Sequence, residues 1–211
     1  MCRLLAVRDA ESFAIPDQLR ALAMMARHSR EYQGDGWGCA WWDGHAWHAY
    51  RSVTPIWEDR LDRFGETRLL LAHARSAFRN EGIAVENNMP FIEDEVAFVF
   101  NGELRGVRLT APGRIGADKL FTVLRQLGGA RDTAALARAV DIVVRRTAYV
   151  RAMNLVMVNR ERIRVVSRFG EDPDYFTMHI KQDTTRLAIC SEPCAGDAGW
   201  RPIANGSVLE F

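Results

Sequence analysis

The sequence predicts an α+β protein whose strands form sheets stacked in layers. Two observations lead to this prediction: strand-like apolar runs dominate the chain, and the helical segments are grouped rather than alternating one for one with strands. Regular alternation would favour a doubly wound parallel sheet, whereas grouped helices favour separate layers. A length of 211 residues suffices for one domain with a sizeable core, so we expect a single domain over residues 1–211.

Strand-like runs recur along the whole chain. The segments 37–42 and 45–51 flank Asp43-Gly44, a dipeptide typical of a tight hairpin turn. The runs 67–74 and 96–100 are almost continuously apolar, as expected for strands that are covered on both faces. The remaining strands are expected at 2–8, 152–159, 162–168, 175–180, 186–191 and 207–211.

Three segments have the spacing of amphipathic helices. Apolar residues recur every three or four positions in 16–28, 117–127 and 133–147, which gives each segment one apolar face. Pro16 suits the first turn of a helix, and Thr133 lies close to a position where a hydroxyl group can cap one. The last two helices follow each other directly, which is the grouping that favours a layered arrangement.

The composition argues against several classes of protein. The 28 basic and 27 acidic residues leave a net charge of +1, and the arginines are scattered, so we expect no nucleic-acid partner. The sequence shows no leader peptide and no apolar run of about 18 residues that could cross a membrane. We therefore expect a cytoplasmic protein without a membrane partner.

Metal and cofactor motifs are also missing from the sequence. Among the four cysteines, Cys190 and Cys194 have a C-x3-C spacing, but no second cysteine or histidine pair with ligand spacing accompanies them. There is no phosphate-binding P-loop and no glycine fingerprint for a dinucleotide. We expect neither a metal ion nor a cofactor.

Cys2 is the candidate nucleophile. Cysteine is small enough to permit removal of Met1, and removal would leave Cys2 with a free α-amine. Such an amine has an ordinary pKa of about 7.7, and a thiol one of about 8.5. One residue would then supply both nucleophile and base, which is the arrangement of the N-terminal nucleophile hydrolases. Taken alone, a cysteine at this position is more often an ordinary strand residue.

Three later positions each have a structural and a functional interpretation. Arg75 ends a buried strand, so it needs an anionic partner from the protein or from a ligand. Asn101-Gly102 follows another strand and forms either a turn or a pair of donors for an oxyanion. Asp118 lies in the first turn of a helix, as a capping acid or as a ligand for a substrate ammonium group.

Several short motifs follow one another in a characteristic order. They are MCR at the start, GDGWG at 34–38, HARSA at 73–77, NNMPF at 87–91, NG at 101–102, GAD at 116–118 and CSEP at 190–193. This order resembles the class II glutamine amidotransferases, whose nucleophile is an N-terminal cysteine. The resemblance spans essentially the whole chain. It is nearest to the small stand-alone branch of that family, which includes the γ-glutamyl hydrolase of ergothioneine biosynthesis.

The resemblance implies a fold and an activity. The family fold is a four-layer αββα sandwich of two stacked antiparallel sheets. Cys2 would attack the side-chain amide of glutamine or of a γ-glutamyl amide and form a thioester, which water would cleave to release glutamate. Arg75 would clamp the substrate α-carboxylate, and Asp118 would hold its α-ammonium group. Asn101 and Gly102 would form the oxyanion hole.

Three positions depart from the pattern of this family. Met89 and Phe100 stand where the family usually has histidine, and Phe78 stands where many members have threonine. These changes make the expected pocket more apolar and favour a γ-glutamyl compound larger or more apolar than glutamine. They leave two other functions open. One is a partner-dependent subunit that supplies ammonia to a synthase, and the other is a degenerate amidotransferase fold that binds a metabolite or a protein.

Overall fold

The computed structural model describes residues 1–193 and 196–211, with the backbone alone at residue 80. Cys194, one half of the C-x3-C pair, therefore lies outside the described residues. Within the described ranges the chain forms two sheets and several helices.

The first sheet contains seven strands, and every neighbouring pair in it is antiparallel. In spatial order the strands are β11 (Arg201–Pro202), β9 (His179–Gln182), β10 (Arg186–Cys190), β1 (Arg3–Ala14), β4 (Glu66–Ala74), β2 (Trp37–Trp42) and β3 (Trp47–Ser52). Two neighbouring strands near its centre meet at the site described below, where β1 begins and β4 ends.

The second sheet contains five strands and is also antiparallel throughout. Its longest contact joins β6 to β7, which run beside each other from Ala97 to Val107 of β6. In spatial order the strands are β12 (Ser207–Glu210), β8 (Ile163–Ser167), β7 (Thr147–Val158), β6 (Val96–Val107) and β5 (Phe91–Glu93).

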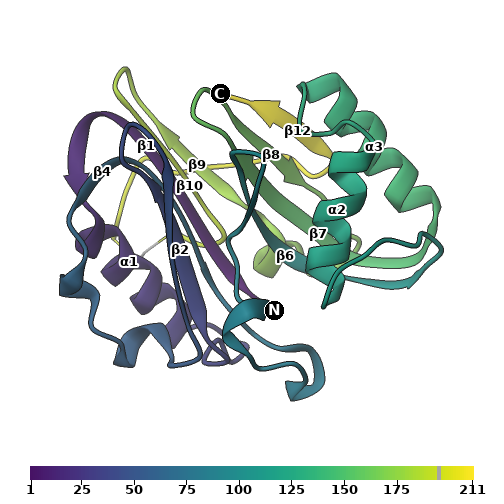
Figure 1. Ribbon diagram of the computed structural model, residues 1–211, viewed down its shortest axis with the longest axis horizontal. Helices are drawn as coiled ribbons and strands as arrows, with labels where there is room; N and C mark the ends of the chain where they lie inside the picture. Colours follow the sequence, from purple (N-terminus) through teal and green to yellow (C-terminus); the bar gives the residue numbers. More distant parts are fainter. Residues whose placement is uncertain (194–195) are drawn as a thin grey trace.

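Helices cover the outer faces of both sheets, so the molecule has four layers (Figure 1). The helix α1 (Ile15–Arg27) packs on the first sheet, and α2 (Gly116–Gln126) and α3 (Thr133–Arg145) pack on the second. The predicted α+β class and αββα sandwich are confirmed. The shorter helical segments are α4 (Pro173–Phe176), η1 (Ile56–Glu58), η2 (Leu61–Arg63), η3 (Phe78–Asn80) and η4 (Val85–Asn87).

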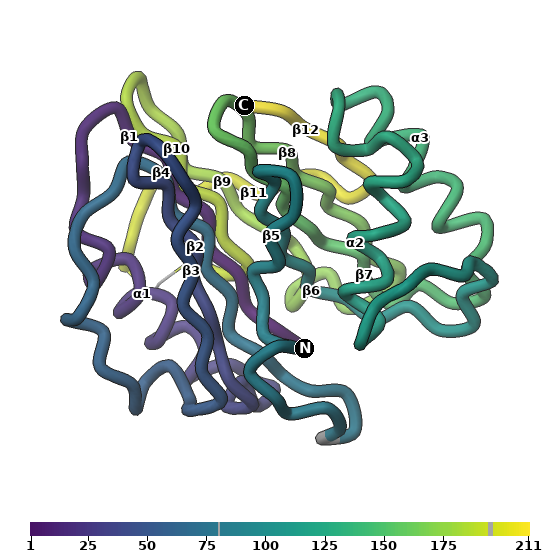
Figure 2. The backbone as a smooth tube through the Cα atoms, viewed as in Figure 1, coloured from purple at the N-terminus to yellow at the C-terminus, as the bar shows by residue number. Residues whose placement is uncertain are grey.

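The first half of strand β1 contains an uninterrupted apolar run at 4–7. Leu4 and Ala6 pack in the cluster that also contains residues of the second sheet, whereas Leu5 and Val7 pack in the cluster that contains α1. Successive side chains of a strand point to opposite faces, so both faces of β1 are covered. The N-terminus lies where the two sheets face each other, beside the segment that follows β4 (Figure 2).

Two expectations from the sequence are wrong. The strand expected at 175–180 is instead the short helix α4 followed by β9, because two buried aromatic residues, Tyr175 and Phe176, fill one helical turn. A short apolar run does not distinguish such a turn from a strand. The turn interpretation of Asn101-Gly102 is also wrong, because β6 continues through both residues to Val107.

The contact between α2 and the second sheet gives a test of the outer layer. Phe121 of α2 is 1% exposed and stacks on Phe98 of β6, with ring centroids 4.7 Å apart. Replacing Phe121 by alanine is expected to lower the free energy of unfolding by about 3 to 5 kcal/mol, because a cavity remains under the helix. Urea denaturation measures this loss.

The matched control is Leu127→Ala at the end of the same helix, where the leucine is 37% exposed. This variant is expected to lose less than about 1 kcal/mol, because its side chain is partly in solvent. Equal losses for the two variants would contradict the assignment of Phe121 as an anchor of α2.

Candidate active site

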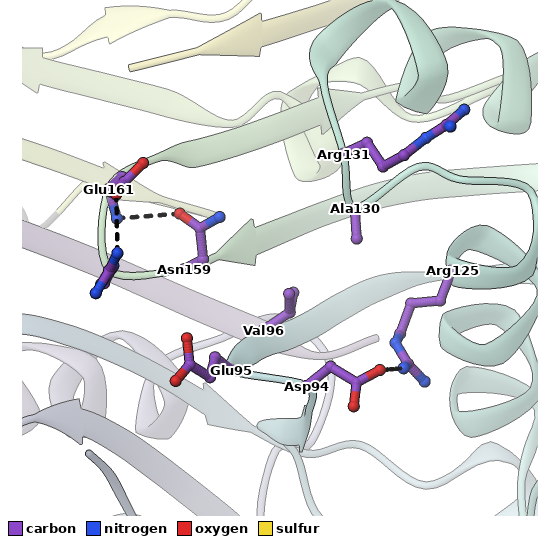
Figure 3. Close-up of a pocket in the computed structure, with 9 residues that line it drawn as sticks. Asp94, Glu95, Val96, Arg125, Ala130, Arg131, Asn159 and Glu161 are labelled. Atoms are coloured by element: carbon purple, nitrogen blue, oxygen red, sulfur yellow. Dashed lines mark hydrogen bonds and ion pairs between the residues drawn. The ribbon is translucent and has the colours of Figure 1, made fainter. Parts of the chain in front are cut away.

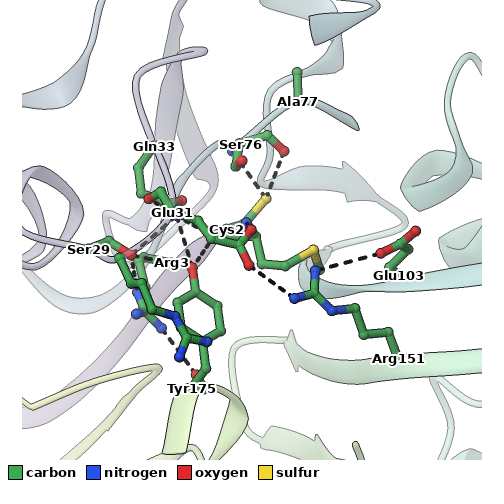
Figure 4. Close-up of polar contacts among 12 residues, drawn as sticks. Cys2, Arg3, Ser29, Glu31, Gln33, Ser76, Ala77, Glu103, Arg151 and Tyr175 are labelled. Carbon is green, nitrogen blue, oxygen red and sulfur yellow. Dashed lines mark hydrogen bonds and ion pairs between the residues drawn. The ribbon is translucent and has the colours of Figure 1, made fainter. Parts of the chain in front are cut away.

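The thiol of Cys2 lies beside the end of strand β4 (Figure 4). Arg3, the first residue of β1, pairs with Ala74, the last residue of β4. Cys2 and Ser76 therefore meet just beyond the paired region. The Cys2 Sγ lies 3.4 Å from the backbone nitrogen of Ser76 and 3.6 Å from its carbonyl oxygen. The antiparallel register of two central strands thus positions the candidate nucleophile.

A cavity of about 950 Å³ opens beside this thiol. Three of the residues singled out in the sequence, Cys2, Arg75 and Gly102, line it. Charged residues at its wall include Glu31, Glu103 and Arg151, and its apolar residues include Met89, Phe100, Leu104, Leu109, Ile115 and Val123. Further charged residues of the lining are Arg79, Glu81, Arg105, Arg114 and Lys119, so the cavity combines an apolar wall with many charged side chains.

The guanidinium group of Arg75 is buried without an ion-pair partner among the described residues. It donates to the carbonyl oxygens of Gly82 at 2.8 Å and Glu81 at 3.4 Å, and to the side-chain oxygen of Asn88 at 3.5 Å. Burial lowers the pKa of Arg75, because removal from water disfavours its charge. An arginine that lines a cavity in this state suits an anionic ligand such as a carboxylate.

The glycine-rich loop at 34–38 fixes the backbone on both sides of Ser76. The Arg75 N–H donates to the Gly36 carbonyl at 2.8 Å, and the Asp35 carboxylate accepts from the Ala77 N–H at 2.7 Å. Gly36 has a φ of +111°, and a Cβ there would lie 2.3 Å from Asn88 Nδ2. Glycine is therefore required at this point of the loop.

Gly102 presents its backbone N–H at an open strand edge. It lies opposite Met153, whose own N–H donates away from β6, to the Arg168 carbonyl at 2.7 Å. In an antiparallel pair of strands, the backbone N–H and C=O groups of two opposite residues either point towards each other or both point away. The Gly102 N–H therefore points away from β7, along a stretch of β6 that β5 does not reach, since β5 pairs only with Val96–Phe98.

The side chain of Asn101 is buried, and both of its polar atoms lack a partner among the described residues. The residue is 0% exposed, and neither its Oδ1 nor its Nδ2 atom forms a hydrogen bond. Because Phe98 faces α2, strand alternation turns Asn101 to the opposite face, towards the sheet that contains β1. An unpaired buried amide costs about 1 to 3 kcal/mol. Asn101 is not among the residues that line the cavity, so its role as an oxyanion donor stays a prediction.

The thiol needs a base, and the nearby histidine is a poor one. Burial raises the pKa of the Cys2 thiol, although the N-terminal ammonium group and the Ser76 N–H oppose this shift. The thiol is therefore protonated at neutral pH. Burial lowers the pKa of His73 to about 3, and its Nε2 is 3.1 Å from the Phe100 carbonyl oxygen. A group with so low a pKa accepts protons weakly.

A second, smaller cavity of about 430 Å³ contains none of the predicted site residues. It is lined by residues that include Asp94, Glu95, Arg125 and Arg131, and Arg125 pairs with Asp94 (Figure 3).

Across the described ranges, no cluster of three or more His, Cys, Asp or Glu side chains has the geometry to hold a metal ion. The helices of the same ranges are too short or too polar to span a membrane.

Comparison with known proteins identifies the architecture. A glutamine phosphoribosylpyrophosphate amidotransferase from B. subtilis superposes with a TM-score of 0.71 at 17% identity, over 99% of this chain and 47% of that chain. A glutamine aminotransferase class-II domain protein from Silicibacter pomeroyi superposes with a TM-score of 0.68 at 18% identity, over 99% of this chain and 94% of that chain. This chain has the class II glutamine amidotransferase fold.

A distant relationship is also detectable in the sequence. The γ-glutamyl-hercynylcysteine sulfoxide hydrolase of Mycobacterium tuberculosis is 25% identical over 209 residues, which cover 92% of this chain and 83% of that protein. No protein-family model matches the chain. The predicted resemblance to class II glutamine amidotransferases and to the ergothioneine-pathway hydrolase is therefore confirmed at the level of fold and distant homology.

The amidotransferase fold does not bring Asp118 into the cavity. Its carboxylate accepts from the Arg114 N–H at 2.9 Å and pairs with the Arg114 side chain at 3.4 Å, as a structural acid at the start of α2. Gly116, two residues earlier, does line the cavity, and a Cβ there would meet no atom within 4 Å. The ammonium-binding role of Asp118 stays a prediction, and the carboxylates in the cavity wall are those of Glu31, Glu81 and Glu103.

The three departures from the family pattern all lie at the cavity. Met89 and Phe100 are 3% and 8% exposed and form part of its apolar wall, while Phe78 lies at the wall with 57% of its surface exposed.

Sequence reasoning missed Gln33 and Tyr175, which both contact the Met1 carbonyl oxygen next to Cys2. Gln33 directly precedes the glycine-rich loop, and this position was the only feature of the sequence that pointed to it. Nothing in the sequence around Tyr175 pointed to the site.

Burial of His73 makes a prediction about acid stability. The folded pKa, about 3, lies below the ordinary value of 6.5, so the unfolded state binds the extra proton between these values. Stability is therefore intact above about pH 6.5 and falls as the pH decreases towards 3, with a slope of up to about 1.4 kcal/mol per pH unit.

We expect His73→Gln to remove this slope. Between pH 6.5 and 4.5 the wild type should lose about 2 to 3 kcal/mol more than the variant, because only the wild type carries the histidine. Urea denaturation at a series of pH values measures the difference. Parallel curves for the two proteins would mean that His73 takes up its proton at its ordinary pKa in the folded state.

Proposed function

We propose that this protein hydrolyses the side-chain amide of γ-glutamyl compounds, with Cys2 as its nucleophile after removal of Met1. The observation that supports this most directly is that Cys2 lines the same cavity as Arg75, whose guanidinium group has no ion-pair partner among the described residues. A thiol next to a carboxylate-binding arginine matches a substrate that carries an α-carboxylate on one side and an amide on the other. The activity and substrate in the name of the mycobacterial relative agree with this class of reaction.

The first half of the proposed reaction forms a thioester. The freed α-amine of Cys2 takes the thiol proton as the sulfur attacks the amide carbon, and the C–N bond then breaks. The α-ammonium group gives its proton to the departing nitrogen, so ammonia or an amine leaves. The negative charge on the oxygen between these steps would be held by the Asn101 amide and the Gly102 N–H.

The second half of the reaction hydrolyses the thioester. The α-amine, now neutral again, takes a proton from water while the water oxygen attacks the thioester carbon. The C–S bond breaks, glutamate leaves, and the proton returns to the sulfur. One amine thus acts as base and acid in both halves, and no cofactor is needed in this scheme.

The size of the cavity supports a substrate larger than glutamine. Small-molecule sites typically enclose about 300–1,000 Å³, and this cavity of about 950 Å³ is at the upper end of that range. Its apolar wall, which includes Met89 and Phe100, would contact the substituent on the departing nitrogen. We therefore propose a γ-glutamyl amide with a partly apolar amine as the preferred substrate.

The decisive experiment measures glutamate released from glutamine and from a panel of γ-glutamyl amides. Protein whose intact mass confirms that it begins at Cys2 should hydrolyse at least one compound, and Cys2→Ala should have no measurable turnover. Cys39→Ala is the matched control, because Cys39 lies in the core under α1, and it should retain turnover. Absence of turnover by protein that begins at Cys2 would favour a partner-dependent subunit or a binding protein instead.

Asn101 and Arg75 should affect different kinetic constants. Asn101→Ala is expected to lower kcat by about 100- to 1,000-fold with little change in KM, because one oxyanion donor is lost. Arg75→Gln is expected to raise KM by about 10- to 100-fold, because a charge-assisted contact to the substrate is lost. Steady-state kinetics on the best panel compound measures both constants.

Thermal unfolding of the same variants controls for damage to the fold. Asn101→Ala should unfold close to the wild-type temperature, because its amide forms no hydrogen bond with the described residues that the substitution could break. A kcat within threefold of wild type in this variant would rule out Asn101 as an oxyanion donor.

A further inference from the structure

A buried polar cluster lies directly behind Cys2 (Figure 4). Gln33 is 0% exposed and Tyr175 is 4% exposed, and the Gln33 Nε2 lies 3.2 Å from the Tyr175 hydroxyl. The hydroxyl groups of Ser29 and Tyr175 are 3.3 Å apart. Arg3 donates to the Ser29 hydroxyl at 3.2 Å and stacks over the Tyr175 ring at 4.1 Å. This cluster joins the loop after α1 to the short helix α4.

The cluster converges on one peptide group. The Tyr175 hydroxyl donates to the Met1 carbonyl oxygen at 2.8 Å, and Gln33 Nε2 donates to the same oxygen. That oxygen and the Cys2 nitrogen belong to one amide, and standard bond lengths place them roughly 2.3 Å apart. Both side chains therefore contact the peptide group that contains the Cys2 nitrogen.

We propose that Gln33 and Tyr175 hold the α-amine of Cys2 once Met1 has been removed, and so orient its lone pair towards the thiol. This inference rests on the proposed function, which requires that amine as the base. Removal of Met1 takes away a carbonyl acceptor and adds N–H donors at the same place. The two side chains would then act as acceptors instead of donors.

An unpartnered atom of Gln33 supports this exchange. The Gln33 Oε1 is buried and accepts no hydrogen bond from the described residues, while Nε2 is shared among several acceptors. A half-turn of the amide exchanges the two atoms at no cost in shape. The carbonyl oxygen of Gln33 would then face the Cys2 amine. The Tyr175 hydroxyl is able to accept as well as donate.

Charged groups surround the amine but largely compensate one another. Glu31 pairs with Arg151 at 3.1 Å and with the Met1 ammonium group, and Arg151 also lies 3.7 Å from Glu103. Arg3 pairs with Glu192 at 2.5 Å. Arg30 stacks over the Tyr175 ring at 4.7 Å and pairs with Asp172, and Glu171 pairs with Arg151 at 2.9 Å. Arg75 and Asp35 also lie near the Cys2 thiol, and His73 is neutral. Removal of Met1 leaves Glu31 with Arg151 as its partner, and Gln33 and Tyr175 are the uncharged side chains that contact the peptide group of Cys2.

The test measures the pKa of the amine itself in a protein that cannot turn over. Protein that begins at residue 2 and carries Cys2→Ala keeps a free α-amine, and its isotope-labelled N-terminal alanine would be titrated by NMR. Gln33→Leu removes one acceptor and should lower the pKa of this α-ammonium group by about one unit. Tyr175→Phe should lower it in the same direction while keeping the aromatic ring under Arg3.

An isosteric variant keeps the test valid if Gln33→Leu fails to fold. Gln33→Glu has nearly the same shape and places a negative charge beside the amine, so it should raise the pKa by about one unit or more. Gln18→Leu is the matched control, because Gln18 accepts from Arg186 at 2.9 Å rather than from the cluster, and it should leave the pKa unchanged.

The outcomes separate this inference from the proposed function. Opposite shifts in Gln33→Leu and Gln33→Glu, with none in Gln18→Leu, would support the inference even if no γ-glutamyl compound is hydrolysed. A pKa that stays within about 0.2 units, the error of such a titration, in all Gln33 and Tyr175 variants would overturn it, even in an active hydrolase.

Discussion

Antiparallel pairing of β1 with β4 is the constraint on which the candidate site depends. The register sets Arg3 against Ala74, and it therefore sets Cys2 beside Ser76 and Arg75. A shift by one residue would turn every side chain of β1 to the opposite face of the sheet. Side chains on both faces of β1 are packed in the core, so such a shift would force both layers to repack. The geometry of the site is thus fixed by packing that lies mostly elsewhere.

Most of the fold was predictable because its strands and helices have strong periodic patterns. The runs at 67–74 and 37–42 correspond to β4 and β2, and the helix expected at 133–147 corresponds to α3. The errors have local causes. β6 continues through Asn101-Gly102 because β7 pairs with it along this stretch, and a pairing partner cannot be read from a turn-like dipeptide. Tyr175 and Phe176 satisfy a buried helical turn as well as a strand.

The sequence predicted part of the site, and there is a physical reason why it could not predict the rest. Cys2, Arg75 and Gly102 follow the ordered motifs, and all of them line the cavity. Gln33 and Tyr175 are 142 positions apart, so only the folded chain brings them together. The orientation of Asp118 depends on its bond to Arg114, which competes with the cavity for the carboxylate. Sequence spacing identifies which residues are present, while tertiary contacts decide where their side chains point.

The first residue of α2 affects how related proteins with this fold are able to differ in the ligands that they bind. Gly116 lines the cavity, and a Cβ built on it would have open space around it. A methyl group there would extend into open space without displacing any atom of the protein. A substitution at this position is therefore able to change which ligand is bound without changing the packing of the core. Close relatives with the same stability are free to differ there by one residue and, as a result, to prefer different compounds.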